Sequence, residues 1–321
     1  GAHARKSLRG RYCRGVDTIS MPTSVSIRFT HAALQAIAED NDIDLLHIKG
    51  PTVDERLLAV VSAGDQLCGA PGTVARQSVD ADVLVRPAHV DRLFEVMHRH
   101  GWVTAYDFAD GSAFEPAATL THPVLSPADV HRRFPGIGID ASTAFDRLWA
   151  ERHTALIAGT PCPVPSLRAQ RLLLIVHAAR GGALDHSDIQ RSWHFGTEEE
   201  RAAVQQLADD LGAEVALAAG TGRLEEYHGM RGYELWKALS TNERSHVRIW
   251  VARVRSEAKV AGALRTAIRL ILPNPRRLHT PLGRRPTARE VARADAQRAR
   301  WGLGEVAELV RSTGLGRRGR R

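Results

Sequence analysis

The sequence predicts an α/β head that ends near residue 165, an all-helical second half and a basic tail. Short apolar or β-branched runs alternate with amphipathic helical patterns in the head, whereas only helical periodicities follow Pro165. Arginines are concentrated at the C-terminal end. These observations predict three regions, at residues 20–165, 166–275 and 276–321, with no internal repeat.

Composition and hydropathy place the chain among globular proteins. It has 321 residues, of which 43% are hydrophobic and 25% are charged, so a mostly disordered chain is excluded. No stretch approaches the roughly 20 consecutive apolar residues of a membrane span. The first 15 residues lack the apolar centre of a secretory signal, and the three cysteines form no metal or disulfide pattern. We therefore expect a cytoplasmic protein with free thiols.

The net charge of +8 belongs to the tail. Residues 276–321 contain 13 arginines and four acidic residues, a net charge of +9, so the remainder of the chain carries −1. The tail could make weak contact with a polyanion, or it could be a solvated end, and the sequence leaves both interpretations open. The nearly neutral body argues against extensive contact with nucleic acid.

The first elements of the head are a helix, a strand and a turn. An amphipathic helix is predicted near Thr30–Asp40, and the apolar run Leu45–Ile48 predicts a buried strand. Lys49-Gly50-Pro51 then predicts a tight turn, followed by a helix over about Thr52–Ser62. The glycines and proline of residues 64–72 are typical of a loop.

Strands dominate the remainder of the head. Alternation predicts a strand over Ser78–Val85, and Pro87 opens a helix that reaches His100. Four further short strands are predicted, near Trp102–Tyr106, Thr119–Leu125, Ala128–Arg132 and Thr154–Ile157.

The second half contains helical patterns throughout. The clearest helices are predicted over Ser166–Ala179, Asp188–Phe195, Glu198–Leu211 and Asn242–Leu272. The last of them has an apolar stripe opposite a basic face, which suits either a membrane-surface helix or a packed helix with a solvated face. We favour packing, because packed helices of this kind are commoner.

Two aspartates carry the sharpest chemical signal. In a strand, Asp80 and Asp82 would project from the same face, where their mutual repulsion is costly unless a cation lies between them. Mg²⁺ suits such a pair, although two hydrated aspartates at a strand end would have the same spacing. Asp129, in a later predicted strand, is the candidate third carboxylate, and Asp140 is the substitute for it.

An ordered series of motifs resembles a known family. The series is Ile48-Lys49-Gly50-Pro51, then Arg76 with Asp80-Ala81-Asp82-Val83-Leu84-Val85, then Asp129-Val130-His131, then the apolar helix ending His177-Ala178-Ala179, then Asp188-Ile189. It resembles the bacterial nucleotidyltransferase family of the DNA polymerase beta-like superfamily, over roughly residues 30–195.

The resemblance implies an α+β fold, with a nucleotidyltransferase-like mixed sheet, flanking helices and an all-helical C-terminal half. It also implies Mg²⁺-dependent transfer of an NMP from an NTP such as ATP to an acceptor hydroxyl or phosphate, with release of pyrophosphate. Asp80, Asp82 and Asp129 would hold Mg²⁺, with two ions expected, and Asp129 would act as or orient the general base. The acceptor could be a small molecule, a peptide or protein, or RNA.

The resemblance also implies binding residues. Those expected at the nucleotide are Lys49, Gly50, Thr52, Arg76 and Ser78. Those expected in the acceptor site or cleft are His131, His177, Arg180 and Asp188. Three of the latter have structural alternatives: His131 could close a strand, His177 could be a core residue, and Asp188 could cap a helix or pair with an arginine.

Two departures from the superfamily pattern motivate a second function. The loop from Ser62 to Thr73 lengthens the gap before Arg76 and Asp80. Pro51 occupies the phosphate turn and removes one N–H donor. The alternative is therefore a catalytically degenerate protein that binds a nucleotide or a partner.

Overall fold

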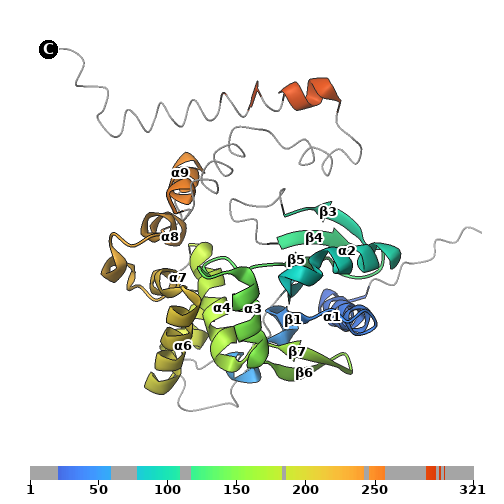
Figure 1. Ribbon diagram of the computed structural model, residues 1–321, viewed down its shortest axis with the longest axis horizontal. Coiled ribbons are helices and arrows are strands. Elements are labelled where there is room, and N and C mark those ends of the chain that lie inside the picture. The colour runs from blue at the N-terminus through green and yellow to red at the C-terminus, as the bar shows by residue number, and fades with distance from the viewer. Residues whose placement is uncertain are drawn as a thin grey trace, which may run out of the picture.

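The fold is a five-stranded mixed sheet with helices on both faces, followed by a helical C-terminal half (Figure 1). The computed structural model describes residues 21–58, 78–108, 117–182, 186–241, 246–256, 287–293, 296–297 and 300. The α+β class implied by the motifs is confirmed.

The sheet has the strand order β1-β2-β5-β4-β3. Its strands are β1 (Leu45–Ile48), β2 (Ala81–Val85), β3 (Val103–Tyr106), β4 (Ala117–Thr121) and β5 (Ala128–His131). The central pair β2 and β5 is parallel, and every other pair is antiparallel. β2 is buried at every residue, as expected for a strand covered on both faces.

Alternation along the strands divides the interior into two cores. Val83 and Val85 of β2 pack with α1 (Thr23–Glu39) and α2 (Val90–Arg99). Leu84 belongs to the other core, which contains α3 (Ala141–Ala150) and α4 (Leu167–Arg180). Because side chains at i and i+2 share a face, Asp82 lies on the face of Leu84, toward the helical half.

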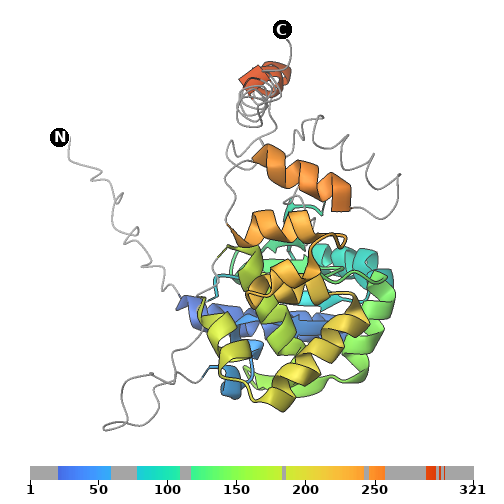
Figure 2. The same ribbon diagram turned by 90° about the vertical axis from the view of Figure 1, so that its left-hand side faces the viewer.

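The helical half is built around α4, which is buried on nearly all sides. The further helices are α5 (Ser187–Ile189), a π-helical segment (Gln190–His194), α6 (Glu198–Leu211), α7 (Glu214–Gly220), α8 (Tyr233–Ser240) and α9 (His246–Ser256). Figures 1 and 2 both show α9 lying on α8. The described part of the helix predicted over 242–272 therefore packs on α8. The remainder of that helix lies outside the described residues.

The segment between β5 and α3 joins the two halves of the molecule. The backbone N–H groups of Gly138 and Ile139 both donate to the Leu211 carbonyl at the end of α6, at 3.0 and 3.2 Å. Gly136 lies beside Val176 of α4 and Trp236 of α8, in a backbone conformation with φ +95°. The chain therefore passes directly from the sheet into the helical core.

Several predicted elements differ from the structure. The helix predicted over 52–62 is wrong in its described part, where Gly50–Thr52 and Glu55–Leu57 form two separate 3₁₀ turns. Asp54 interrupts them by accepting a hydrogen bond from the Arg56 N–H. The strand predicted from Ser78 begins only at Ala81, because the Ser78 hydroxyl folds back onto the Asp80 carbonyl at 2.8 Å. The predicted helix Asp188–Phe195 is divided between α5 and the π-helical segment.

A second, smaller sheet is a hairpin of β6 (His153–Ile157) and β7 (Thr160–Val164). β7 was not predicted, since its two prolines, Pro161 and Pro163, argue against a strand in the interior of a sheet. In the part of the chain that the structure describes, no helix is long and apolar enough to cross a bilayer.

Candidate active site

Two carboxylates meet because of the register between β2 and β5. Asp82 and Asp129 are direct partners in this parallel pair, so their side chains leave adjacent strands on the same face. His131, two residues after Asp129, shares that face. The predicted strand positions of Asp82 and Asp129 therefore bring these residues together at the sheet centre.

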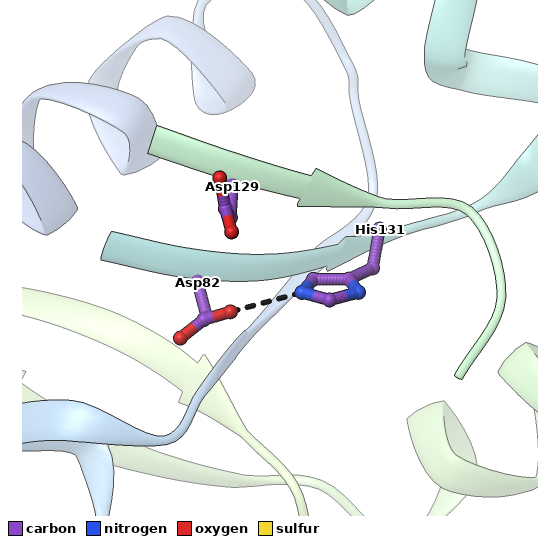
Figure 3. A group of neighbouring side chains, drawn as sticks. All are labelled: Asp82, Asp129 and His131. Carbon is purple, nitrogen blue, oxygen red and sulfur yellow. Dashed lines mark hydrogen bonds and ion pairs between the residues drawn. The ribbon is translucent and has the colours of Figure 1, made fainter. Parts of the chain in front are cut away.

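The three side chains form a compact cluster with ligand atoms within 4.8 Å of one another (Figure 3). The His131 Nε2–H donates to Asp82 Oδ1 at 2.9 Å. The Thr119 hydroxyl on β4 donates to Asp129 Oδ1 at 2.6 Å. Each carboxylate is thus oriented by a side-chain donor and keeps a second oxygen.

Lys49 adds a positive charge to the cluster. Its Nζ lies 2.5 Å from Asp82 Oδ1, and the two side chains are only 8% and 5% exposed. Lys49 follows β1, whose last residue pairs with Asp82, so the end of one strand faces the start of the other. Its backbone has φ +59° and ψ −169°, a region that residues other than glycine seldom occupy.

Gly50 and Ser78 lie against each other beside the acidic cluster. A Cβ added to Gly50, at φ +51°, would lie 3.4 Å from the Ser78 Cβ and hydroxyl. The Thr52 hydroxyl donates to the Lys49 carbonyl at 2.6 Å, so it stabilises its own turn. Arg76 lies outside the described residues.

The electrostatics of the three aspartates differ. Burial raises the pKa of Asp80, and repulsion from Asp82 and Asp129 raises it further. Burial also acts to raise the pKa of Asp82, but Lys49 and the His131 hydrogen bond outweigh it and hold that pKa well below the ordinary value. Asp82 is therefore a permanent anion. The pKa of Asp80 is raised in part by the negative charges of Asp82 and Asp129.

The C-terminal end of α4 lies near the acidic cluster. Burial lowers the pKa of Arg180, whereas the charges of Asp82 and Asp129 oppose that change. Arg180 and His177 line a small cavity of about 10 Å³ together with Lys49, His131 and Phe134. Two of the predicted cleft residues thus lie close to the cluster.

A larger cavity shares a wall with the site. It has a volume of about 690 Å³, and Phe134 and Pro135 line both it and the small cavity. Its remaining walls come from the segment after β5 and from α3, α7, α8 and α9. The space is therefore built mostly by the helical half.

Two further sequence candidates lie at helix starts. Asp140 is the N-cap of α3, where its carboxylate accepts from the backbone N–H groups of Ser142 and Thr143, so it does not substitute for Asp129. Asp188 is buried at the start of α5, and its N–H donates to the His186 ring. His186 is therefore the N-cap of α5, so the helix-capping alternative for Asp188 is wrong, and its pairing with an arginine stays a prediction.

The sequence did not indicate Thr119 or Phe134. Thr119 reaches Asp129 because β4 pairs with β5 in a register that sets these two residues opposite each other. Phe134 packs near the His131 ring, with centroids 6.0 Å apart. Cross-strand register is not readable from one sequence, so no local signal marks either residue.

The arrangement can hold a divalent cation. Asp82 and Asp129 supply the oxygen ligands that Mg²⁺ prefers, and the ring of His131 supplies a nitrogen that suits Mn²⁺ or Zn²⁺. The buried Nδ1 of His131 has no hydrogen-bond partner among the described residues. The acidic pair, with Asp82 buried and Asp129 half-buried, lies near a lysine and an arginine, and this combination also suits an anion that carries its own metal ion.

Comparison with known proteins identifies the family. Residues 30–229 match the family described as "uncharacterised nucleotidyltransferase". No curated protein is similar enough in sequence to count as a relative.

Three solved structures are similar in part. The first is the antibiotic-resistance factor ANT(2'')-Ia, with 14% identity, a TM-score of 0.34, and coverage of 64% of this chain and 95% of the other. The lincosamide antibiotic adenylyltransferase LnuA has 14% identity and a TM-score of 0.29, with coverage of 55% and 92%. An antigenic nucleotidyltransferase-like protein from Paracoccidioides brasiliensis has 16% identity and a TM-score of 0.35, with coverage of 61% and 94%.

Proposed function

Because this chain belongs to that nucleotidyltransferase family, we propose that it transfers an NMP from an NTP to an acceptor hydroxyl or phosphate and releases pyrophosphate. The observation that carries the proposal is the in-register pair Asp82 and Asp129 on one face of the sheet. Their carboxylate oxygens and a His131 ring nitrogen lie within 4.8 Å of one another. A small molecule, a peptide or protein, and RNA all remain acceptable acceptors.

The proposed cofactor is Mg²⁺, with ATP among the candidate substrates. Asp82 and Asp129 would hold the cation, and Asp80 would complete the acidic set from its position just before β2. When bound, Mg²⁺ supplies charge neutralisation at the triphosphate and lowers the pKa of the acceptor hydroxyl. The oxygen donors fit this ion.

The chain's own residues would position the reactants. Asp129, which Thr119 holds in place, would accept the acceptor's proton or orient its hydroxyl. Lys49 and Arg180 would contribute positive charge to the phosphates, and Gly50 and Ser78 would let the triphosphate approach the backbone closely. Little covalent chemistry is required of the protein, because phosphoryl-type transfer depends mainly on positioning and charge.

Pyrophosphate release tests the proposal. Purified protein is incubated with each labelled NTP, Mg²⁺ and a panel of acceptors that covers the three classes. We expect Asp82→Asn to lower the rate by at least about 100-fold, because it removes a charge that acts on the transferring group. Asp140→Asn is the matched control, since asparagine keeps the N-cap and the residue lies outside the cluster. Equal rates in both variants would refute the assignment.

A catalytically degenerate nucleotide-binding protein is the second candidate. It is favoured by Pro51 in the turn and by the engagement of the Thr52 hydroxyl with the Lys49 carbonyl, which leave few donors for phosphate. Calorimetry separates the two candidates. Mg²⁺-dependent NTP binding without turnover, across the whole acceptor panel, would support the degenerate protein, whereas turnover would end it.

We also propose that the basic tail makes weak contact with a polyanion. Its support is the concentration of arginines after residue 275 in a chain whose body is nearly neutral.

A further inference from the structure

Lys49 already occupies the carboxylate that the proposed cation needs. Its ammonium lies 2.5 Å from Asp82 Oδ1, and His131 donates to the same oxygen at 2.9 Å. Asp82 is one of the three members of the described cluster that could hold a metal ion. The same carboxylate would therefore have to serve both the Lys49 ammonium and a bound metal ion.

The backbone at Lys49 is held in a strained conformation that directs this side chain. Its φ of +59° and ψ of −169° suit glycine, and yet the sequence places glycine at the next position and lysine here. The Thr52 N–H and hydroxyl both donate to the Lys49 carbonyl, at 3.1 and 2.6 Å, and so fix the peptide. Lysine stands at this position although glycine would relax the backbone, which indicates a requirement for the ammonium itself.

Charge balance explains the requirement. Asp82 is buried beside Asp129, and a buried carboxylate without a counter-charge is strongly unfavourable. Lys49 supplies that counter-charge while no divalent cation is bound. A divalent cation bound by Asp82 would stand close to the ammonium, and the two positive charges would repel each other.

We propose that Lys49 is a built-in counter-ion that competes with the divalent cation for Asp82, so that cation binding releases its ammonium for the triphosphate. This inference rests on the proposed function, because the released charge needs a phosphate to receive it. Linkage makes the effect reciprocal: the nucleotide, by attracting Lys49, would strengthen binding of the cation. Free Mg²⁺ would then bind weakly, and Mg²⁺ with NTP tightly.

Calorimetric titration of the full chain with Mg²⁺ alone tests the competition. We expect Lys49→Met to bind Mg²⁺ about tenfold more tightly than the wild type or better, since a competing charge a few ångströms away is removed. Lys49→Arg keeps the positive charge and should bind Mg²⁺ no more tightly than the wild type. Lys49→Gly removes the charge and also the backbone strain, and it should behave as Lys49→Met does.

Thermal unfolding provides a second measurement, because Lys49→Met leaves Asp82 buried without its partner and could lower stability. Adding Mg²⁺ should raise the melting temperature of Lys49→Met more than that of the wild type, since a tighter ligand stabilises the folded state more. An equal or smaller increase would overturn the proposal.

Asp82→Asn separates the two possible failures. If Mg²⁺ binds the wild type and Lys49→Met equally and is lost in Asp82→Asn, the cation site stands and the competition is refuted. If Mg²⁺ binds none of the proteins, with or without NTP, the proposed function and this inference fail together.

Discussion

Gly136 lies where the segment after β5 enters the helical core, and it has no room for a side chain. A Cβ at this position would lie 2.7 Å from Val176, 2.9 Å from Ala216 and 2.9 Å from Trp236. Its φ of +95° is also unfavourable for any other residue. Close packing and backbone conformation therefore both require glycine here.

We expect Gly136→Ala to lower the free energy of unfolding by about 3 kcal/mol, because overpacking adds to the cost of a positive φ. Gly159→Ala is the matched control: its φ is +83°, but nothing lies within 4 Å of the added Cβ. Urea denaturation of both variants isolates the contribution of packing. Equal losses of stability would show that the backbone alone accounts for the effect.

At the scale of elements, α3 begins at a well-formed cap. Asp140 accepts from the Ser142 and Thr143 N–H groups at 3.0 and 3.2 Å. We expect Asp140→Ala to lower the free energy of unfolding by about 1 kcal/mol, and Asp140→Asn to leave it nearly unchanged. Urea denaturation measures both. A large loss of pyrophosphate release in a folded Asp140→Ala protein would contradict its structural role.

The interface between α1 and β1 contains a buried histidine pair. His31 Nδ1 lies 2.9 Å from His47 Nδ1, and the His47 Nε2–H donates to Gln35 Oε1 at 2.9 Å. Burial lowers the pKa of His31 from 6.5 to about 4, and burial and the neighbouring His31 hold the pKa of His47 well below its ordinary value. Both rings are therefore neutral in the folded protein.

This pair predicts the acid sensitivity of the fold. Between pH 6.5 and 4, the histidines of the unfolded chain are protonated while His31 of the folded protein stays neutral. The contribution of His31 to the free energy of unfolding is therefore fully present above pH 6.5 and is lost as the pH is lowered toward 4. The loss from His31 alone is on the order of 3 kcal/mol. Urea denaturation across this pH range should show that the free energy of unfolding depends less steeply on pH in the double variant His31→Leu/His47→Leu. The exposed His100→Gln should keep the wild-type slope, and identical slopes in all three proteins would refute the assignment.

Much of the sheet was predictable at this scale, because its strands are apolar runs bounded by turn residues. The predicted Leu45–Ile48 strand coincides with β1, and Ala128–Arg132 exceeds β5 by one residue. The cluster was predictable only in part, since Asp82 and Asp129 carry local patterns whereas Thr119 depends on cross-strand pairing. Asp80 fell outside its predicted strand because the Ser78 hydroxyl competes for the backbone there.

For the whole molecule, the positive charge is concentrated at the C-terminal end of the sequence. The body carries a net charge of −1, and the 46 residues of the tail carry +9. We expect the affinity for single-stranded RNA to fall with salt, with a log–log slope of about −0.7 for each phosphate contacted. Deleting residues 276–321 should abolish this affinity and leave Mg²⁺-dependent NTP binding intact. Fluorescence anisotropy at several salt concentrations measures the slope, and unchanged affinity after the deletion would exclude the tail as the anchor.

The hydrogen bonds from Gly138 and Ile139 to the end of α6 have a mechanical consequence. The strand that carries Asp129 and His131 continues into these contacts without an intervening flexible linker. A rotation of the helices that lets in a bulky acceptor would therefore displace Asp129, the carboxylate that we propose takes part in the reaction. Anyone who exchanges the helices of this enzyme for those of a relative should transfer residues 132–140 with them.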